Sequence, residues 1–391
     1  MSVFQRLDDN INLVEEERLV LDAVSALCRD QIAPRAAAYD ASSEFPWDNI
    51  NAINDLGLNG MFIPEGYGGA RTSYLSYLAV MREMAKSCAA TALIWGTTFH
   101  AIKPVVDFAN EAQKLRLLPK IAAGGLASLC ITEPTAGSDA TGMKTKFTPD
   151  GDEIVITGGK TFITTGDHAD LYVVFGKWSE IENDKAAISV VLVEKGAEGT
   201  GGLHILGKED KMGQRASSTV SLAFEDLRVP RSNLLCEPGD GLKILFSALN
   251  KSRPSIAAHA LGIARAAFED AVAYINQRQQ SGRNIIEFQG IQFLLADLAT
   301  DLALCESWLW RVGAMIDAGE DDIGVEASML KMRASDLAMR ITTEAVQLHG
   351  GYGYIKDYPV ERYMRDAKIT QIYEGTNQIH RQLIGRSFID R

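Results

Sequence analysis

Residues 365–381 read RDAKITQIYEGTNQIHR, and this stretch near the end of the chain offers one carboxylate where a helical pattern breaks. Glu374 stands between Tyr373, whose ring is largely apolar, and Gly375, which permits backbone conformations closed to most residues. The polar side chains that follow, beginning with Thr376, can cap a new helix. A carboxylate that loses its water at such a break is a stronger base. A lone glutamate at a turn is most often a solvated surface group, so the rest of the chain decides between these readings.

Apolar spacing divides the 391 residues into a helical first third, a β-rich middle and a helical last part. In residues 1–128 it predicts helices over 11–31, 34–40, 47–56, 73–86, 89–109 and 111–123. In residues 129–240, short β-branched runs between Gly, Asp and Asn turns predict an antiparallel barrel or sandwich. In residues 241–391, Ala- and Leu-rich stripes predict packed helices over 242–278, 288–318 and 325–348. The expected fold class is therefore α+β.

The composition argues against several classes of protein. A net charge of −12 disfavours binding of nucleic acid through its phosphates and adhesion to anionic membranes. No apolar run has the length of a membrane span, and the first residues show no secretory signal. The five cysteines form no CxxC pair, so we expect free thiols in a reducing cytoplasm. We expect no metal site, because no two of these isolated histidines have ligand spacing: His100, His204, His259 and His380.

The β domain opens with SLCITEPTAGSDA, residues 128–140. This segment supplies Thr132, Ser138 and a turn at Gly137 whose backbone amides can face a ligand. An isolated GSD is ordinarily a Ser or Asx turn, but the TEP before it makes the pattern more specific. GGYGY at 350–354 follows a helical pattern, whereas a dinucleotide fingerprint must follow a strand.

The chain resembles the acyl-CoA dehydrogenases, a flavoprotein family, over nearly its full length. The resemblance rests on seven motifs in order: IPEGYGG (63–69), CITEPTAGSDA (130–140), KTFITTG (160–166), FEDLRVP (224–230), Arg278 followed by EFQ (287–289), QLHGGYGY (347–354) and RDAKITQIYEGTNQIHR (365–381). It implies a helical domain, a β domain and a four-helix bundle. It also implies bound FAD, an acyl-CoA substrate, electron-transfer flavoprotein as electron acceptor, and a homotetramer built as a dimer of dimers.

The resemblance assigns Glu374 as the catalytic base that removes the α-proton of an acyl-CoA thioester. Flavin N5 then accepts the β-hydride, and the product is a trans-2-enoyl-CoA. Some relatives carry the base on an earlier helix, in the stretch that reads NKSRPS here (250–255), but this chain has Ser252 at that place. Glu374 is therefore the candidate base.

The resemblance also implies the residues that contact the cofactor and the substrate. Flavin contacts are expected from Leu129, Ile131, Thr132, Ser138, Phe162, Thr164, Thr376 and Gln378. Contacts with the pyrophosphate and adenosine of a neighbouring subunit's FAD are expected from Arg278, Gln289, Gln347 and Gly351. Substrate contacts are expected from Ser138, Asn250 and Arg253 with coenzyme A, from Tyr373 and Gly375 beside the base, and from Ala92 and Gly96 at the end of the acyl pocket.

The chain departs from the family pattern at three places. Phe162 stands where many members have tryptophan at the flavin edge that faces the electron acceptor. Ser281 replaces an aromatic residue near the adenosine part of the flavin. Residues 88–96 contain no arginine, so a dicarboxylic acyl group is not expected.

The small residues Ala92 and Gly96 share one helix face and favour a deep pocket for medium or longer straight-chain acyl groups. Trp95, on an adjacent face, could close that pocket again. Plain packing of the helix against a neighbour explains the same small residues equally well.

Two alternatives to a dehydrogenase remain open from the sequence. The first keeps the fold and changes the reaction: related proteins are oxidases that use oxygen, or lyases that eliminate a β-substituent without net redox change, although such lyases lack the usual base. The second alternative is a non-catalytic protein that only holds CoA thioesters or FAD. The intact set Glu374, Thr132, Ser138, Thr164 and Arg278 argues against it.

Overall fold

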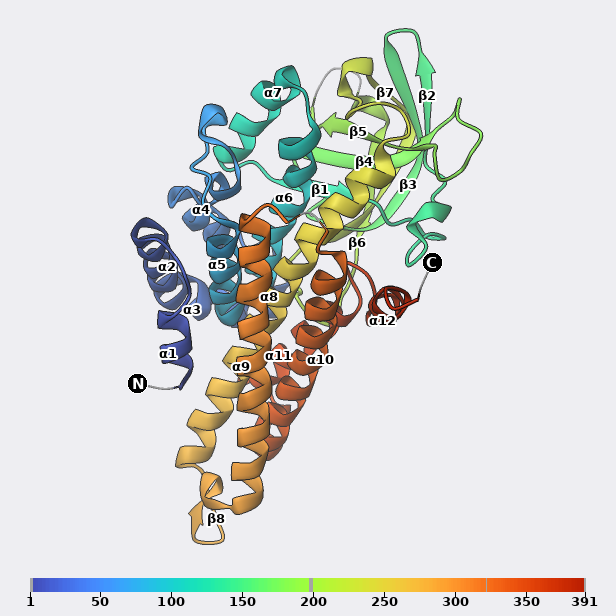
Figure 1. Cartoon of the computed structure of the whole chain (residues 1–391). Coiled ribbons are helices and arrows are strands. Elements are labelled where there is room, and N and C mark those ends of the chain that lie inside the picture. Colours follow the sequence, from blue (N-terminus) through green and yellow to red (C-terminus); the bar gives the residue numbers. More distant parts are fainter. Residues whose placement is uncertain (1–2, 197–199, 321, 390–391) are drawn as a thin grey trace.

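The computed structural model describes residues 3–196, 200–320 and 322–389 and shows helices, a curled sheet and a long helical bundle in chain order (Figure 1). The first part holds α1 (Val3–Asp9), α2 (Glu15–Leu27), α3 (Ala33–Ser42), α4 (Trp47–Asp55), α5 (Tyr74–Ser87), α6 (Ala89–Phe108) and α7 (Glu111–Ala122). The helix expected over 11–31 begins only at Glu15. The Glu17 carboxylate accepts hydrogen bonds from the backbone N–H of Val14 (3.4 Å) and of Ser73 (2.6 Å), which fixes the start of α2.

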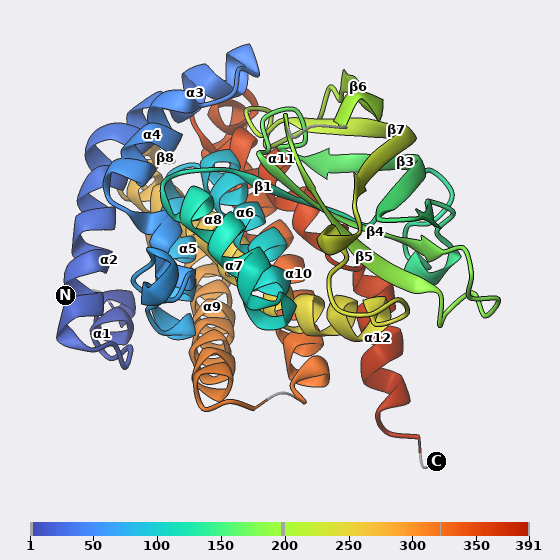
Figure 2. The same cartoon turned by 90° about the horizontal axis from the view of Figure 1, so that it is seen from above.

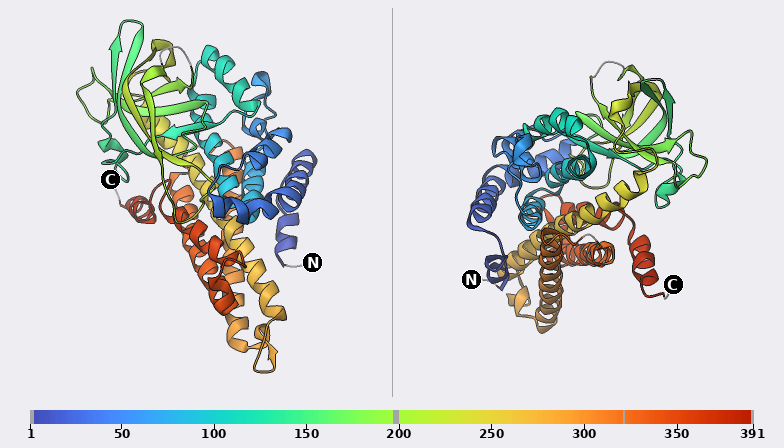
Figure 3. Two further views of the ribbon diagram at one scale, coloured as in Figure 1. Left: turned by 180° about the vertical axis from the view of Figure 1, so that it is seen from behind. Right: turned by 45° about the horizontal axis from the view of Figure 1, so that its top comes forward.

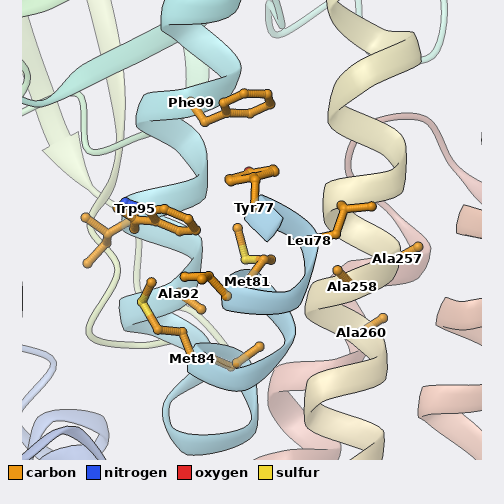
Figure 4. Close-up of a cluster of buried hydrophobic side chains, with 14 of the residues drawn as sticks. Tyr77, Leu78, Met81, Met84, Ala92, Trp95, Phe99, Ala257, Ala258 and Ala260 are labelled. Atoms are coloured by element: carbon orange, nitrogen blue, oxygen red, sulfur yellow. The ribbon is translucent and has the colours of Figure 1, made fainter. Parts of the chain in front are cut away.

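Helices α5 and α6 are apolar on nearly all sides because they lie inside the molecule rather than on its surface. Figure 4 shows Tyr77 and Met81 of α5 packed against Trp95 and Phe99 of α6, with the alanines of the next helix, α8 (Gly241–Gln277), on the other side. The rings of Tyr77 and Phe99 stack with centroids 4.1 Å apart. This aromatic cluster forms the packed core between α5 and α6.

The middle part is a mixed sheet of β1 (Ala127–Cys130), β2 (Lys146–Asp150), β3 (Glu153–Thr164), β4 (Leu171–Trp178), β5 (Ile188–Glu194), β6 (Leu203–Lys208) and β7 (Thr219–Pro230). The strand order is β1-β4-β2-β3-β7-β6, with β5 paired to β4. The predicted antiparallel pairing holds for most pairs, but β4 runs parallel to both β1 and β2. The Ser128 hydroxyl donates to the Thr164 carbonyl (2.8 Å), so the sheet curls until β1 meets the end of β3.

Strand β4 is buried on both faces, which explains its continuous apolar sequence LYVVFGKW. Val173 and Phe175 pack into the core shared with the helices. Tyr172 and Val174 point the other way, into the sheet's own core. Because alternate side chains of β4 pack into these two cores, this strand joins the β domain to the helices.

The last part contains α8, α9 (Gln289–Asp317), α10 (Gly324–His349), α11 (Val360–Lys368) and α12 (Asn377–Arg386), and its three long helices end within one residue of the predicted bounds. A hairpin, β8 (Gln279–Gln280) and β9 (Arg283–Asn284), joins α8 to α9. Figures 1 and 3 show this hairpin at the end of the bundle that extends away from the sheet, and Figure 2 shows α12 projecting from the opposite side to α1. Within the described ranges, no helix is long and apolar enough for a membrane crossing.

The segment that leads into the candidate site is held by all three parts of the chain. Arg365 of α11 pairs with Asp40 of α3 (2.7 Å) and donates to the Met212 carbonyl in the β domain (3.1 Å). The buried Asp366 carboxylate accepts from the backbone N–H of Gln214, and burial raises the pKa of Asp366 to about 6. These contacts fix residues 365–366 before the chain turns toward Glu374.

Candidate active site

A cavity of about 470 Å³ lies where the helical, β and C-terminal parts meet. It is lined by Leu93, Thr97 and His100 of α6, by Ile256 of α8, by Leu129, Ile131, Thr132, Gly137, Ser138, Phe162, Ile163 and Thr164 of the β domain, and by Ile369, Ile372, Tyr373, Glu374, Gly375 and Thr376. The structure thus brings together most of the residues expected around the flavin and the base, although they come from distant parts of the sequence.

Two residues on this cavity have left-handed backbones that only glycine adopts without cost. Glu374 has φ +55° in the loop before α12, and Phe162 has φ +57° where the pairing of β3 with β7 skips between Lys160 and Ile163. This irregularity leaves Phe162 64% exposed although strand residues flank it on both sides. Strained non-glycine residues gather at functional sites, because the surrounding structure must hold them there.

The Glu374 carboxylate is 17% exposed and has polar partners from two helices. The Ser252 hydroxyl of α8 donates to Glu374 Oε2 at 2.6 Å. His100 Nδ1 of α6 lies 4.0 Å from Glu374 Oε1. Ser252, which stands where some relatives carry their base, here serves as a donor to Glu374.

Two buried cations lie near the carboxylate. Lys331 of α10 donates to the Gly375 carbonyl at 2.6 Å, and burial lowers the pKa of Lys331 to about 7 while the Glu374 carboxylate opposes that shift. Burial also lowers the pKa of Arg253, again opposed by Glu374, and the Arg253 Nε–H has no hydrogen-bond partner among the described residues. Both side chains therefore interact electrostatically with the Glu374 carboxylate.

The residues around Glu374 are fixed by hydrogen bonds within the chain. Burial lowers the pKa of His259 to about 4, so its ring is neutral at pH 7. Its Nε2 lies 2.9 Å from the Ala89 carbonyl and must donate there, which leaves Nδ1 to accept from the Tyr373 hydroxyl (3.1 Å). On the other side, the Thr376 hydroxyl caps α12 by accepting from the Ile379 N–H (3.4 Å).

The β wall of the cavity presents hydroxyls that the chain does not use. The side chains of Thr132, Ser138 and Thr164 line the cavity, and none has a hydrogen-bond partner within the described residues. The segment that carries Thr132 is held by the buried Glu133, which pairs with Lys160 (2.7 Å) and accepts from the Thr145 N–H (2.9 Å). These contacts hold the segment in place while its free hydroxyls face the cavity.

A second cavity, of about 580 Å³, lies beside the hairpin end of the bundle and contains Arg278, Gln347 and Gly351. The guanidinium of Arg278 stacks over the Tyr352 ring, 5.6 Å from its centroid, and pairs with no carboxylate among the described residues. The structure thus separates these residues from the Glu374 cavity within one chain. Ser281 lies in the adjacent hairpin turn, where it and Gly282 have φ of +51° and +80°.

Six of the predicted contact residues lie outside both cavity linings: Ala92, Gly96, Asn250, Arg253, Gln289 and Gln378. Ala92 is buried in the helical core (Figure 4). A Cβ on Gly96 would overlap the methyl group of Met81, so this glycine permits close packing of α5 on α6. The cavity is bordered instead by Leu93, Thr97 and His100, the adjacent face of the same helix.

Sequence reasoning did not name His100 and Thr97 as cavity residues, because it considered only the face of α6 that carries Ala92 and Gly96. Leu93, Thr97 and His100 are spaced i, i+4, i+7 and therefore share one helix face. This spacing is the sequence signal that could have identified them. In the part of the chain that the structure describes, no three His, Cys, Asp or Glu side chains gather as a metal site would require.

Three domain models of one family match consecutive parts of the chain. They are described as acyl-CoA dehydrogenase N-terminal domain (residues 14–125), middle domain (128–227) and C-terminal domain (239–389). A short-chain specific acyl-CoA dehydrogenase from Clostridium acetobutylicum is 38% identical over 378 residues, which are 96% of this chain and 98% of that protein.

Solved structures agree with the family match. Butyryl-CoA dehydrogenase from Megasphaera elsdenii has a TM-score of 0.93 and 37% identity, covering 97% of this chain and all of that one. A chain from Acidaminococcus fermentans, in a structure concerned with its electron transferring flavoprotein and flavin-based electron bifurcation, has a TM-score of 0.94 and 38% identity, covering 98% and 100%. The chain therefore belongs to the acyl-CoA dehydrogenases, a family of FAD-dependent oxidoreductases.

Proposed function

We propose that this enzyme oxidises the Cα–Cβ bond of a short-chain acyl-CoA thioester and that Glu374 takes the α-proton. The observation that carries the proposal is the position of Glu374: a strained backbone places its carboxylate in a cavity shared with the unused hydroxyls of Thr132, Ser138 and Thr164. A base at this point would face a ligand bound against the hydroxyls of the β wall. The free backbone N–H of Glu374, which has no partner among the described residues, supports binding of the thioester carbonyl.

The free hydroxyls of the β wall fit a flavin, and the second cavity fits the other end of the same cofactor. Arg278, Gln347 and Gly351 offer a planar cation, an amide and an open backbone, which suit a pyrophosphate. Because one chain keeps these groups apart, the proposed site needs a second copy of the chain, as in a homotetramer. When bound, FAD supplies the hydride acceptor.

Glu374 suits general-base catalysis because its carboxylate is largely withdrawn from water. The α-proton is far too weakly acidic to ionise in water unaided, so a positioned base must take it. Ser252 holds one carboxylate oxygen and leaves the other toward the cavity. The apolar side chains of Leu93, Ile131 and Ile256 keep water away from the reacting carbon.

A short acyl group is the best fit to the closed end of the cavity. The rings of Tyr77, Trp95 and Phe99 pack against one another on α5 and α6 (Figure 4), and we infer that this cluster limits the length of the acyl chain. We therefore favour short acyl groups over the medium or longer ones that Ala92 and Gly96 had suggested. Among the described residues no lysine or arginine lines the cavity, so a dicarboxylic acyl group would leave a carboxylate unpaired.

We further propose that electrons pass to an electron-transfer flavoprotein, and the likeness to the Acidaminococcus fermentans chain supports this partner. Phe162, exposed at the cavity edge, offers an apolar contact on the side where that partner would dock. We place the activity in the cytoplasm, because all five cysteines are free thiols that suit a reducing compartment.

An anaerobic titration of the purified flavoprotein with saturated acyl-CoA thioesters tests this function. We expect butyryl-CoA to bleach the flavin absorption at about one equivalent per subunit, with a product two mass units lighter, and octanoyl-CoA to bleach it much more slowly. Rapid recovery of colour in air without an added flavoprotein would move the assignment to an oxidase. A FAD-loaded protein that no saturated thioester bleaches would contradict the proposal and favour a lyase.

A further inference from the structure

His100 is a buried polar residue that the proposed reaction leaves without a role. It lies on α6 at 5% exposure, lines the cavity and faces Glu374, with its Nδ1 4.0 Å from Glu374 Oε1. Its other ring nitrogen, Nε2, lies 3.0 Å from the Ser255 hydroxyl of α8. An imidazole between a serine and a carboxylate can hold that carboxylate only if its proton is on the correct nitrogen.

The hydrogen bonds behind His100 determine where that proton lies. The Tyr77 hydroxyl of α5 is 2.7 Å from Ser255 Oγ and has no other partner among the described residues. If Tyr77 donates to Ser255 and Ser255 donates to Nε2, both hydroxyl protons have acceptors, and the ring proton is on Nδ1, which faces Glu374 Oε1 from 4.0 Å. With the ring proton on Nε2, one of the two hydroxyl protons is left without an acceptor among the described residues, and a lone pair of Nδ1 faces a carboxylate.

The ring is neutral in this arrangement. Burial lowers the pKa of His100, and the Glu374 carboxylate only partly opposes that shift. His259 of α8, itself a buried ring, interacts unfavourably with a charge on His100. His100 therefore presents an N–H dipole to Glu374 and does not compete with it for a proton.

We propose that His100 is a positioning residue for Glu374, with its Nδ1 proton fixed by the Tyr77–Ser255 pair and directed at Glu374 Oε1. Ser252 holds Oε2 at 2.6 Å, and the Nδ1 proton of His100 faces Oε1 from 4.0 Å. Each oxygen keeps a lone pair for the α-proton. This inference rests on the proposed function, in which Glu374 is the base.

A matched pair of variants separates the two sides of the imidazole. In His100→Asn the amide nitrogen occupies the place of Nδ1, whereas in His100→Gln it reaches the place of Nε2. We expect the limiting rate of flavin bleaching by butyryl-CoA to fall roughly 10- to 100-fold in His100→Gln, the range for losing a hydrogen bond to a charged group. In His100→Asn it should stay within about threefold of wild type, with half-saturating butyryl-CoA little changed in both.

Equal losses in the two variants, or no loss in either, would overturn the proposal. FAD content and melting temperature of each variant show whether the fold is intact, and His100→Leu, which removes both contacts, should match His100→Gln. If Glu374→Gln still bleaches with butyryl-CoA, the proposed function itself fails. If Glu374→Gln is inactive and the His100 series is flat, only the role of His100 fails.

The tautomer can be observed without turnover. In solid-state ¹⁵N spectra of holoenzyme labelled at its six histidines, we expect His100 to carry its proton on Nδ1 and His259, the internal reference, on Nε2. The His100→Asn variant identifies the signal. Ser255→Ala should abolish the preference for Nδ1. A proton on Nε2 of His100 in the wild type would contradict the inference.

Discussion

The two cavities of this chain differ in how their polar groups are partnered. Around Glu374, three parts of one chain meet, and Ser252, Lys331 and Tyr373 all have partners within that chain. Around Arg278 only the end of the helical bundle contributes, and the guanidinium has an aromatic neighbour but no carboxylate among the described residues. Residues of the same chain thus hold the candidate base, whereas the Arg278 guanidinium is left free for a ligand from outside.

Of the changes that test the difference between the two cavities, Arg278→Ala is expected to have the largest effect, which is on FAD binding. Loss of the planar cation should weaken FAD binding roughly 100-fold, because a bidentate contact with a pyrophosphate is lost. Arg340→Ala, on the same bundle but paired with Asp301, is the control and should retain FAD. Flavin released on dilution, measured by fluorescence, checks both.

The proposed site combines the Glu374 cavity of one copy of the chain with the Arg278 cavity of another, and this sharing can be tested separately. Mixed oligomers of Arg278→Ala and Glu374→Gln subunits should regain part of the wild-type activity, because some sites then combine an intact Glu374 cavity with an intact Arg278 cavity. No recovery in mixtures that are shown to exchange subunits would contradict a shared site.

A smaller effect is expected from Lys331→Met, which removes the anchor of the Gly375 carbonyl. Leaving this buried carbonyl unpaired should lower the unfolding free energy by about 1–3 kcal/mol at pH 7. Because the pKa of Lys331 is about 7 in the fold and 10.5 in its ordinary state, the unfolded chain binds more protons between these pH values. Stability from this group therefore rises with pH over that window.

Denaturant unfolding of wild type and Lys331→Met at pH 7, 8 and 9 measures this difference. We expect the wild-type advantage to grow as the pH rises. An advantage that stays constant, or shrinks, would show that Lys331 remains charged inside the protein.

The smallest effect concerns the acyl end of the Glu374 cavity. Leu93→Ala should raise the ratio of kcat/KM for hexanoyl-CoA over butyryl-CoA roughly tenfold, because Leu93 borders the cavity. The neighbouring change Ala92→Val lies in the packed core and should lower stability by about 1–3 kcal/mol with no change in that ratio. If Ala92→Val changed that ratio and Leu93→Ala did not, the acyl chain would bind along the Ala92 face of α6 instead.

Sequence patterns predicted the long elements well because those elements satisfy their hydrogen bonds locally. The bounds of α8, α9 and α10 follow from apolar stripes that one helix can satisfy by itself. The parallel pairing of β4 with β1 and β2 could not be predicted, since strand neighbours far apart in sequence leave no local pattern.

The candidate site was predictable at Glu374 and on the β wall, where motifs mark the residues, but its supports were not. Ser252, His100 and Lys331 approach Glu374 from three helices, and only the packing of those helices brings them together. His100 looked isolated in the sequence because its partners, Ser255 and Glu374, lie far along the chain. The cavity is lined by the face of α6 next to the one that carries Ala92 and Gly96, and only the packing of the helices distinguishes the two faces.

The role of Glu374 as the base is tested most directly by the rate at which butyryl-CoA bleaches the flavin in Glu374→Gln, measured by anaerobic rapid mixing. Gln keeps the size of the side chain and its contact with Ser252 but cannot accept the α-proton. We predict a fall of roughly 10³-fold or more with FAD content unchanged, in the range that a general base contributes. Glu182→Gln, an exposed change outside the site, should be as fast as wild type. A Glu374→Gln rate within tenfold of wild type would contradict the assignment of Glu374 as the base.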